Sequence, residues 1–221
     1  MLEFLYSNYF ILLYALIFIV SMFTYYRYFD TVLKLFPIYI AYTFFTELLG
    51  YLIYTFDDFS FFDDKQYTWY NIIIFNIYAL IVFVYFCWVY KSALRKPKHK
   101  KIIKIGAPSV LVAYALNLIF ENPLYSGLYM ADTIASLFYV WMALLYFSEG
   151  HWKTERHNLM FWVSLSLLLF HVIYPWLNLV GFLKPQIWID YHFRTILKVL
   201  ILVSYSMYLI GLLWCRRSAF R

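Results

Sequence analysis

The sequence predicts an all-α integral membrane protein: a bundle of seven transmembrane helices with its N-terminus outside and its C-terminus in the cytoplasm. Three observations lead to this fold class: the composition, a series of long apolar runs and an asymmetry of basic residues. Of the 221 residues, 65% are apolar or aromatic and only 14% are charged, and the mean hydropathy is +0.69. Soluble domains are about half apolar and about a quarter charged, so this composition excludes an ordinary water-soluble domain.

The apolar runs set the number of helices, because a spanning helix needs about 20 mostly apolar residues. The run nearest the N-terminus follows an acidic rather than a basic start and lacks a small-residue cleavage pattern, so we expect a membrane anchor instead of a removable signal peptide. The fourth run is the shortest, and the seventh is long enough to begin with an interfacial turn. Together they make residues 1–221 one polytopic domain, with helices at roughly 6–26, 35–56, 70–90, 105–121, 127–147, 158–180 and 188–214.

Basic residues set the orientation, since cytoplasmic loops of membrane proteins are enriched in Lys and Arg. With the N-terminus outside, the inner segments hold 14 of the 18 basic residues and the outer segments hold three. Six of the inner set lie in the run from Arg95 to Lys104, which lacks the interleaved aromatic residues of a nucleic-acid stacking platform. We therefore expect this run to contact anionic lipid headgroups, and we expect the protein to lie in the plasma (inner) membrane.

Polar residues recur at helical spacing within the apolar runs, and such residues usually point into a bundle. The shared feature of these stripes is a polar or small side chain every three or four residues. The second helix carries Thr43, Thr46, Glu47, Gly50 and Tyr54; the third adds Asn76; the fourth carries Ser109, Ala113, Asn117 and Glu121; the fifth carries Asp132, Ala135, Ser136, Tyr139, Ala143 and Tyr146; the sixth carries Ser164, His171, Tyr174, Pro175 and Asn178; and the seventh carries Tyr191, Arg194, Lys198, Tyr205 and Tyr208.

The depths of the polar residues predict a cavity open to the outside. At a rise of about 1.5 Å per residue, Glu47, His171 and Lys198 lie about 12–15 Å from the outer ends of their helices. The same rise puts Asn76, Asn117 and Asp132 at about 6–9 Å. The inner halves of the first, third and sixth helices are almost entirely apolar and aromatic. The predicted site is thus a polar cavity above an apolar inner plug, beside a kink at Pro175, whose ring cannot donate to the carbonyl of His171.

Each of these residues also has a purely structural interpretation. Glu47 or Asp132 could pair with Lys198 simply to fix helix register. Asn76 and Asn117 could serve as interhelical hydrogen-bond partners, and His171 could be a packing residue. The outer segment DDFSFFDDKQYTWY, residues 57–70, lacks EF-hand spacing and is expected to be a solvated acidic loop rather than a calcium site. Cys87 and Cys215 fall at inner helix ends, where we expect free thiols.

Enzyme chemistry finds little support in the sequence, and no cofactor or metal is expected. Hydrolase, protease and phosphate-binding motifs are absent. His151 and His157 share the inner segment EGHWKTERH with Glu149 and Glu155, where a charged connector is favoured over a metal site. A minority hypothesis is a retinal-type Schiff base on Lys198, with Glu47 or Asp132 as counter-ion.

The function that these observations favour is binding of a small ligand, ion or lipid headgroup in the outward-facing cavity, by a transporter, sensor or receptor-like module. The alternative is a non-enzymatic structural or accessory subunit whose polar stripes hold helices together. A membrane-protein partner or a homo-oligomer is compatible with either function.

Overall fold

The computed structural model describes residues 9–61, 71–151 and 156–217. Seven of its helices are long and apolar enough to cross a membrane, which confirms the predicted fold class of a multi-pass helical membrane protein. The seven are α2 (Tyr9–Thr24), α3 (Phe36–Thr55), α4 (Ile72–Ala93), α5 (Pro97–Phe120), α6 (Tyr129–Tyr146), α8 (Leu159–Leu183) and α10 (Phe193–Trp214). The shorter elements are η1 (Tyr25–Arg27), η2 (Asp57–Phe59), η3 (Phe147–His151) and α9 (Pro185–Asp190).

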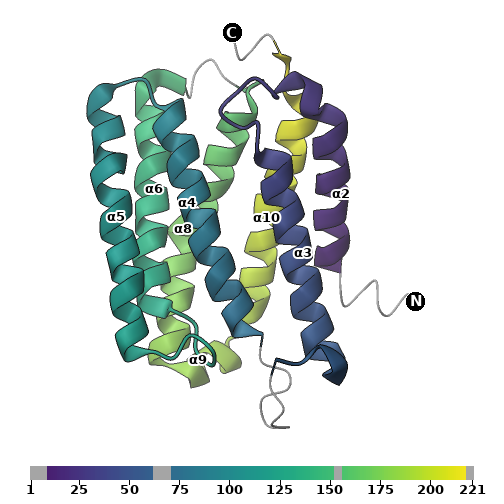
Figure 1. The fold of residues 1–221 in the computed structure, drawn as a ribbon, viewed down its shortest axis with the longest axis vertical. Coiled ribbons are helices and arrows are strands. Elements are labelled where there is room, and N and C mark those ends of the chain that lie inside the picture. The colour runs from purple at the N-terminus through teal and green to yellow at the C-terminus, as the bar shows by residue number, and fades with distance from the viewer. Residues whose placement is uncertain (1–8, 62–70, 152–155, 218–221) are drawn as a thin grey trace.

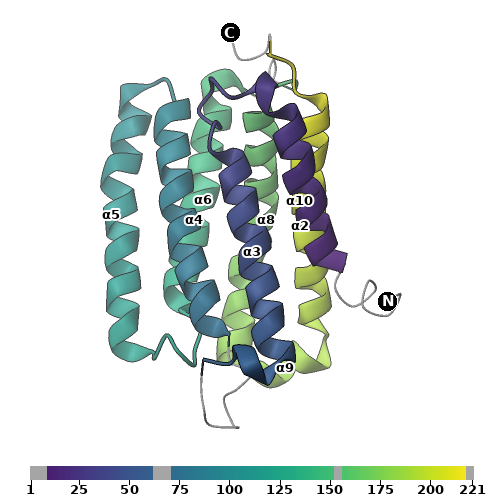
Figure 2. The same ribbon diagram turned by 45° about the vertical axis from the view of Figure 1, so that its right-hand side comes forward.

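The seven long helices run up and down in a single bundle (Figure 1). Six of them form a closed ring, because contacts pass from α2 to α3, α4, α6, α8, α10 and back to α2. Helix α5 packs outside this ring against α4 and α6, and it stands at the edge of the bundle in Figure 2. A ring of six helices cannot bring all its members to a common axis, so it leaves space at its centre.

The outer surface of the bundle suits a lipid environment. Large apolar side chains are exposed along the spanning helices, for example Phe23 at 77%, Ile119 at 73% and Trp176 at 70%. A soluble monomer rarely exposes extended apolar patches of this kind. Apolar side chains on this surface remain solvated by lipid tails, which is consistent with the assignment of the bundle to a membrane.

Two helix boundaries differ from the sequence prediction. The fourth helix was expected from residue 105, but α5 begins at Pro97 and includes the basic run. Proline is favoured in the first helical turn, where its missing N–H has no partner to lose. The expected seventh helix, 188–214, is divided into α9 and α10 by His192, whose φ of 52° is left-handed.

The polar stripes face inward, with four exceptions. Thr43, Thr46, Ala135 and Ser136 are buried, as predicted. Tyr54, at 66% exposed, and Tyr191, at 70%, point out of the bundle instead, and Arg194 is also exposed. The other exception is the exposed Ser109, whose hydroxyl donates to the carbonyl of Ile105 within its own helix. A hydroxyl bonded in this way needs no neighbouring helix, which explains why its position in a stripe was uninformative.

One end of the bundle carries most of the described basic residues and is closed by tightly packed side chains; we call it the basic end. Its closing layer corresponds to the apolar inner plug expected from the sequence. The side chains of this layer are each at most 2% exposed and include Tyr28, Leu33, Phe36, Phe86, Val89, Tyr90, Leu94, Tyr146, Leu159 and Leu212. Side chains packed this closely leave little room for water.

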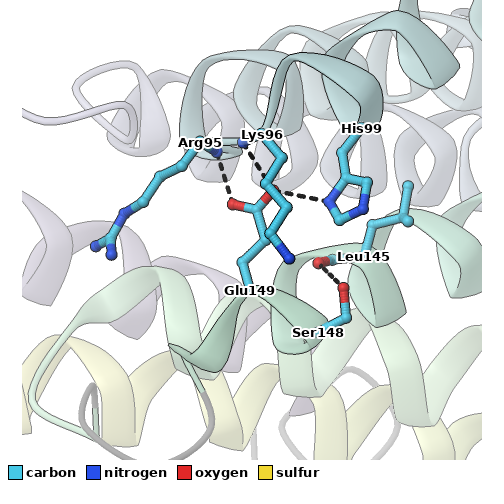
Figure 3. Close-up of polar contacts among 6 residues, drawn as sticks. All are labelled: Arg95, Lys96, His99, Leu145, Ser148 and Glu149. Carbon is cyan, nitrogen blue, oxygen red and sulfur yellow. Dashed lines mark hydrogen bonds and ion pairs between the residues drawn. The ribbon is translucent and has the colours of Figure 1, made fainter.

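Charged residues fasten the connections at the basic end. Glu149, just beyond α6, lies beneath the start of α5 (Figure 3). Its carboxylate accepts hydrogen bonds from the backbone N–H groups of Arg95 at 2.6 Å and Lys96 at 3.0 Å, and it lies 2.7 Å from Nδ1 of His99. The unpaired N–H groups at a helix start attract a carboxylate, so this contact ties the α4–α5 connection to the end of α6.

A second contact at the basic end fastens α2 to α10. The guanidinium of Arg27 donates to the carbonyl oxygens of Leu213 at 3.1 Å and Cys215 at 3.3 Å. These carbonyls belong to the end of α10, where helical partners are missing and a cation is favourable. The first and last spanning helices are thereby joined at the same end as Glu149.

Candidate functional site: an intramembrane cavity

A cavity of 390 Å³ occupies the centre of the helix ring. It is lined by side chains from all seven spanning helices, and along α4 these run from Ile72 to Phe86. That stretch spans about 21 Å at 1.5 Å per residue. The cavity therefore begins near the end of the bundle that carries α9 and extends through about two thirds of its length, ending at the packed layer of the basic end.

The cavity continues toward α9 through a second space of 360 Å³. Tyr129, Tyr174, Asn178 and Leu197 line both spaces. Trp188 of α9 lines only the second, so α9 lies across the route between the cavity and this end of the bundle. The two spaces thus extend together toward the end opposite the basic end.

Four of the six residues predicted to form the site line this cavity. They are Glu47 from α3, Asn76 from α4, Asp132 from α6 and His171 from α8. The helix ring brings these residues together although they are separated by up to 124 positions in the chain (171 − 47). Each is a polar side chain within an apolar run, the feature by which the sequence singled it out.

Glu47 faces the cavity without a protein partner. Among the described residues its carboxylate has no hydrogen bond and no ion pair, and the side chain is mostly buried. Its neighbours along the cavity wall include Tyr14 and Tyr78. A polar group withdrawn from water normally requires compensation, so Glu47 is the member of the site with an unmet interaction.

Asp132 and His171 have partners on adjacent helices. The hydroxyl of Tyr114 donates to Oδ1 of Asp132 at 2.7 Å, which joins α5 to α6. Nδ1 of His171 lies 3.0 Å from the hydroxyl of Ser136, and its ring stacks on Tyr139 with centroids 4.2 Å apart. Both residues are therefore held in defined orientations beside the cavity, as positioned groups and not as free side chains.

A chain of hydroxyl groups connects three of the helices that surround the cavity. Thr43 Oγ1 and Tyr78 Oη are 3.0 Å apart, and Tyr78 Oη lies 3.5 Å from Tyr205 Oη. Tyr205 Oη in turn lies 3.5 Å from Tyr39 Oη. We call Thr43, Tyr78, Tyr205 and Tyr39 the hydroxyl chain. It links α3, α4 and α10, and its three tyrosines line the cavity.

The two asparagines predicted for the site, Asn76 and Asn117, form hydrogen bonds with backbone groups. Asn76 donates to the carbonyls of Pro123 at 2.8 Å and Ser126 at 3.0 Å, and so holds the α5–α6 connection. Asn117 does not line the cavity; its Oδ1 accepts from the N–H of Ala131 at 2.9 Å, in the first turn of α6. The Asn117 contact joins two helices, α5 and α6, whereas Asn76 joins α4 to a connecting segment.

Lys198 lies apart from the other candidates. It is half-buried on α10 but is not among the residues that line the cavity, and no ion pair with Glu47 or Asp132 occurs in the described parts of the chain. The expected pairing of Lys198 with either acid is therefore not made. A Schiff base requires the lysine to face the pigment, so the retinal hypothesis gains no support from this arrangement.

Pro175 and the cysteines can also be placed. Helix α8 continues through Pro175, which is buried, so the proline does not end the helix. Cys87 and Cys215 are free thiols, as expected, and both are buried. In residues 9–61, 71–151 and 156–217, no group of three or more His, Cys, Asp or Glu side chains could hold a metal ion. Residues 62–70 of the acidic outer segment and Glu155 lie outside the described residues.

Sequence reasoning placed Tyr139, Tyr174, Tyr205 and Tyr208 in inward-facing stripes, and these tyrosines line the cavity, but it did not find several others. Tyr14, Tyr78 and Tyr114 all line it, and Tyr114 and Tyr78 hydrogen-bond to other members of the wall. With 24 tyrosines in the chain, a single tyrosine carries little information about position. A usable signal existed for Tyr114, which precedes Asn117 by three residues and so lies on nearly the same helix face.

The fold and the site together define a multi-pass membrane protein with a polar and aromatic cavity inside its helix ring. Comparisons with known protein families, with curated proteins and with solved structures give no match for this chain. Functional reasoning therefore begins from the cavity itself.

Proposed function

We propose that this protein binds a small molecule in its intramembrane cavity and acts as a transporter, sensor or receptor-like module. The observation that carries the proposal is the cavity of 390 Å³ whose lining includes Glu47, a carboxylate with no partner in the part of the chain that the structure describes. Ligand pockets typically measure about 300–1,000 Å³ and combine apolar walls with a few polar groups. Two further hydroxyls of the cavity lining, on Tyr139 and Ser204, also have no hydrogen-bond partner among the described residues.

The proposed orientation places α9 and the approach to the cavity outside. The N-terminus is then outside and the basic end is cytoplasmic, as the distribution of Lys and Arg favours. The side chains that would contact anionic headgroups of the plasma membrane are exposed on the basic run and include Arg95, Lys96, Lys98, Lys101 and Lys104. Each is expected to add about 1 kcal/mol of attraction near such a surface.

The second candidate function is that of a structural or accessory subunit. The contacts of Asn76 and Asn117 favour it, because these amides bond to backbone groups of the protein itself. In that case the polar residues maintain the bundle, and exposed helix faces bind a membrane partner or a second copy. The two candidates differ in one property: whether molecules from water reach the cavity.

Thiol labelling of the cavity wall separates the two candidates. Ala79, on the cavity face of α4, is replaced by cysteine after Cys87 and Cys215 are changed to serine, and the protein is placed in nanodiscs. We expect water-soluble trimethylammonium-ethyl or sulfonatoethyl methanethiosulfonate to modify Ala79→Cys. In the matched control, Cys215→Ser alone, the native Cys87 lies two turns deeper on α4 and outside the cavity lining, so it should remain unmodified.

Two results would contradict the proposal. If Ala79→Cys reacts with neither reagent in folded protein, the cavity is sealed and the accessory-subunit function is preferred. If Cys87 reacts as fast as the cysteine at position 79, access comes through general loosening of the bundle and not through the cavity.

A further inference from the structure

The formal charges facing the cavity are of one sign. Among the described residues its lining contains the carboxyl groups of Glu47 and Asp132 but no lysine or arginine. His171, the remaining titratable nitrogen group there, is already engaged with Ser136 and stacked on Tyr139. The lining therefore offers negative charge and hydrogen-bond acceptors, without a fixed cation to receive an anionic ligand.

The two carboxyl groups are not equivalent. Asp132 is satisfied in part by the hydroxyl of Tyr114, at 2.7 Å, and sits in the first turn of α6. Glu47 has no such donor and lies eight residues from the end of α3, about 12 Å deeper than that end. A charge at this depth is costly unless something pairs with it. Glu47 is thus the group that a bound cation would neutralise.

The aromatic lining of the cavity that contains Glu47 is suited to an organic cation. Tyr14, Tyr39, Tyr78 and Tyr205 line the same cavity, and the rings of Tyr14 and Tyr205 meet edge to face with centroids 4.5 Å apart. Tyrosine faces attract ammonium groups, and aromatic enclosures of this composition recognise alkylated ammonium ions. The hydroxyl chain fixes several of these rings, so the enclosure is already formed before a ligand arrives.

The size and polarity of the remaining space set the rest of the ligand. A volume of 390 Å³ is far larger than a bare metal ion, and most of the wall is apolar or aromatic, including Phe75, Val82 and Ile201. Such walls favour an apolar body. From these observations, and resting on the proposed function of ligand binding, we infer that the ligand is an organic ammonium whose charged group lies beside Glu47 and whose apolar part fills the cavity.

Protection of Ala79→Cys tests the class of ligand with three probes of nearly equal shape. 4-Phenylbutylammonium, 4-phenylbutanol and 4-phenylbutyrate differ mainly in the charge of one end. We expect the ammonium to slow modification by methanethiosulfonate at concentrations at least tenfold lower than the alcohol or the carboxylate requires. This comparison uses the cavity with Glu47 in place, so it does not depend on the folding of any Glu47 variant.

Glu47→Gln then locates the charge that is responsible. Its half-protecting concentration for 4-phenylbutylammonium should rise at least tenfold, which corresponds to about 1.4 kcal/mol of binding free energy. Asp190→Asn is the matched control, because it removes an acid of the same end that lies on α9, outside the cavity lining. It should change the value less than twofold.

The outcomes separate the inference from the function on which it rests. Equal protection by the alcohol or the carboxylate, no protection by the ammonium, or an unchanged value in folded Glu47→Gln overturns the organic-cation assignment while an accessible cavity remains. Failure of the cysteine at position 79 to react with either methanethiosulfonate reagent removes the proposed function, and the cation assignment falls with it.

Discussion

Replacing Asn76 by alanine tests how the connection between α5 and α6 is held beside the cavity. The Asn76 amide donates two hydrogen bonds, at 2.8 Å to the carbonyl of Pro123 and at 3.0 Å to that of Ser126. Its oxygen receives a longer contact from the N–H of Leu128, at 3.4 Å. The change removes all three and leaves backbone groups of the connection without a side-chain partner.

The expected loss follows from the two short bonds. A typical hydrogen bond contributes about 1 kcal/mol to stability, and side-chain bonds measured within membranes average about 0.6 kcal/mol. The unfolding free energy of Asn76→Ala should therefore fall by about 1–2 kcal/mol, with little added by the contact at 3.4 Å. Unfolding in mixed micelles with increasing sodium dodecyl sulfate measures this free energy directly.

Asn71→Ala is the matched comparison on the same helix. Asn71 immediately precedes α4, and its amide donates one hydrogen bond, at 2.8 Å to the carbonyl of Gly50. It should cost about half as much as Asn76→Ala, because one bond is lost in place of two. The reasoning is refuted if Asn76→Ala loses less than about 0.5 kcal/mol, below the range for two bonds, or no more than Asn71→Ala.

Three further predictions address orientation, packing and thiol chemistry. In cells, a cysteine at Ser60 should react with impermeant maleimide from outside, whereas one at the exposed Lys98 should react only after permeabilisation; the reverse pattern would invert the proposed topology. Gly211→Ala should lose about 1–3 kcal/mol in micelle unfolding, because its Cβ would lie 2.6 Å from Cβ of Trp162; unchanged stability would contradict this. Burial raises the pKa of the Cys215 thiol, so its maleimide reaction at pH 7 should be slower than that of an exposed engineered thiol and should accelerate as the pH rises; equal rates would contradict it.

The helices were predictable because hydropathy dominates in a membrane. Each predicted stretch overlaps one spanning helix, and the main error lies at the start of α5. There, Lys98, Lys100 and Lys101 occupy helical positions, but their charges lower the mean hydropathy of this segment below that of a spanning helix. A hydropathy criterion detects the part of a helix within the hydrocarbon, whereas the backbone hydrogen bonds continue into the interface. Pro97 marked the true start in the sequence.

The candidate site was predictable only as far as polarity within an apolar run could show it. Glu47, Asp132 and His171 line the cavity because a polar side chain at that depth is costly toward lipid. The same rule failed for Lys198, whose long side chain gives it more freedom than a short acid has. Which tyrosine rings face inward depends on the rotation of each helix, and that is set by packing among helices far apart in the chain.

The hydroxyl chain has a consequence for the kind of surface that the cavity offers. Each hydroxyl can either donate or accept, and either atom can be the donor in the contacts of Tyr78 with Thr43 and Tyr205 and of Tyr205 with Tyr39. These bonds can therefore reverse their polarity by rotation of O–H bonds alone, while every heavy atom stays in place. In one of the two senses, Thr43 donates to Tyr78 and gives up the hydrogen bond that its hydroxyl otherwise donates to the carbonyl of Tyr39 at 3.0 Å. A wall built in this way has a fixed shape but an interchangeable pattern of donors and acceptors. In an amide or a carboxylate, the position of each atom determines whether it donates or accepts a hydrogen bond. In this wall the positions are fixed, but each hydroxyl can do either.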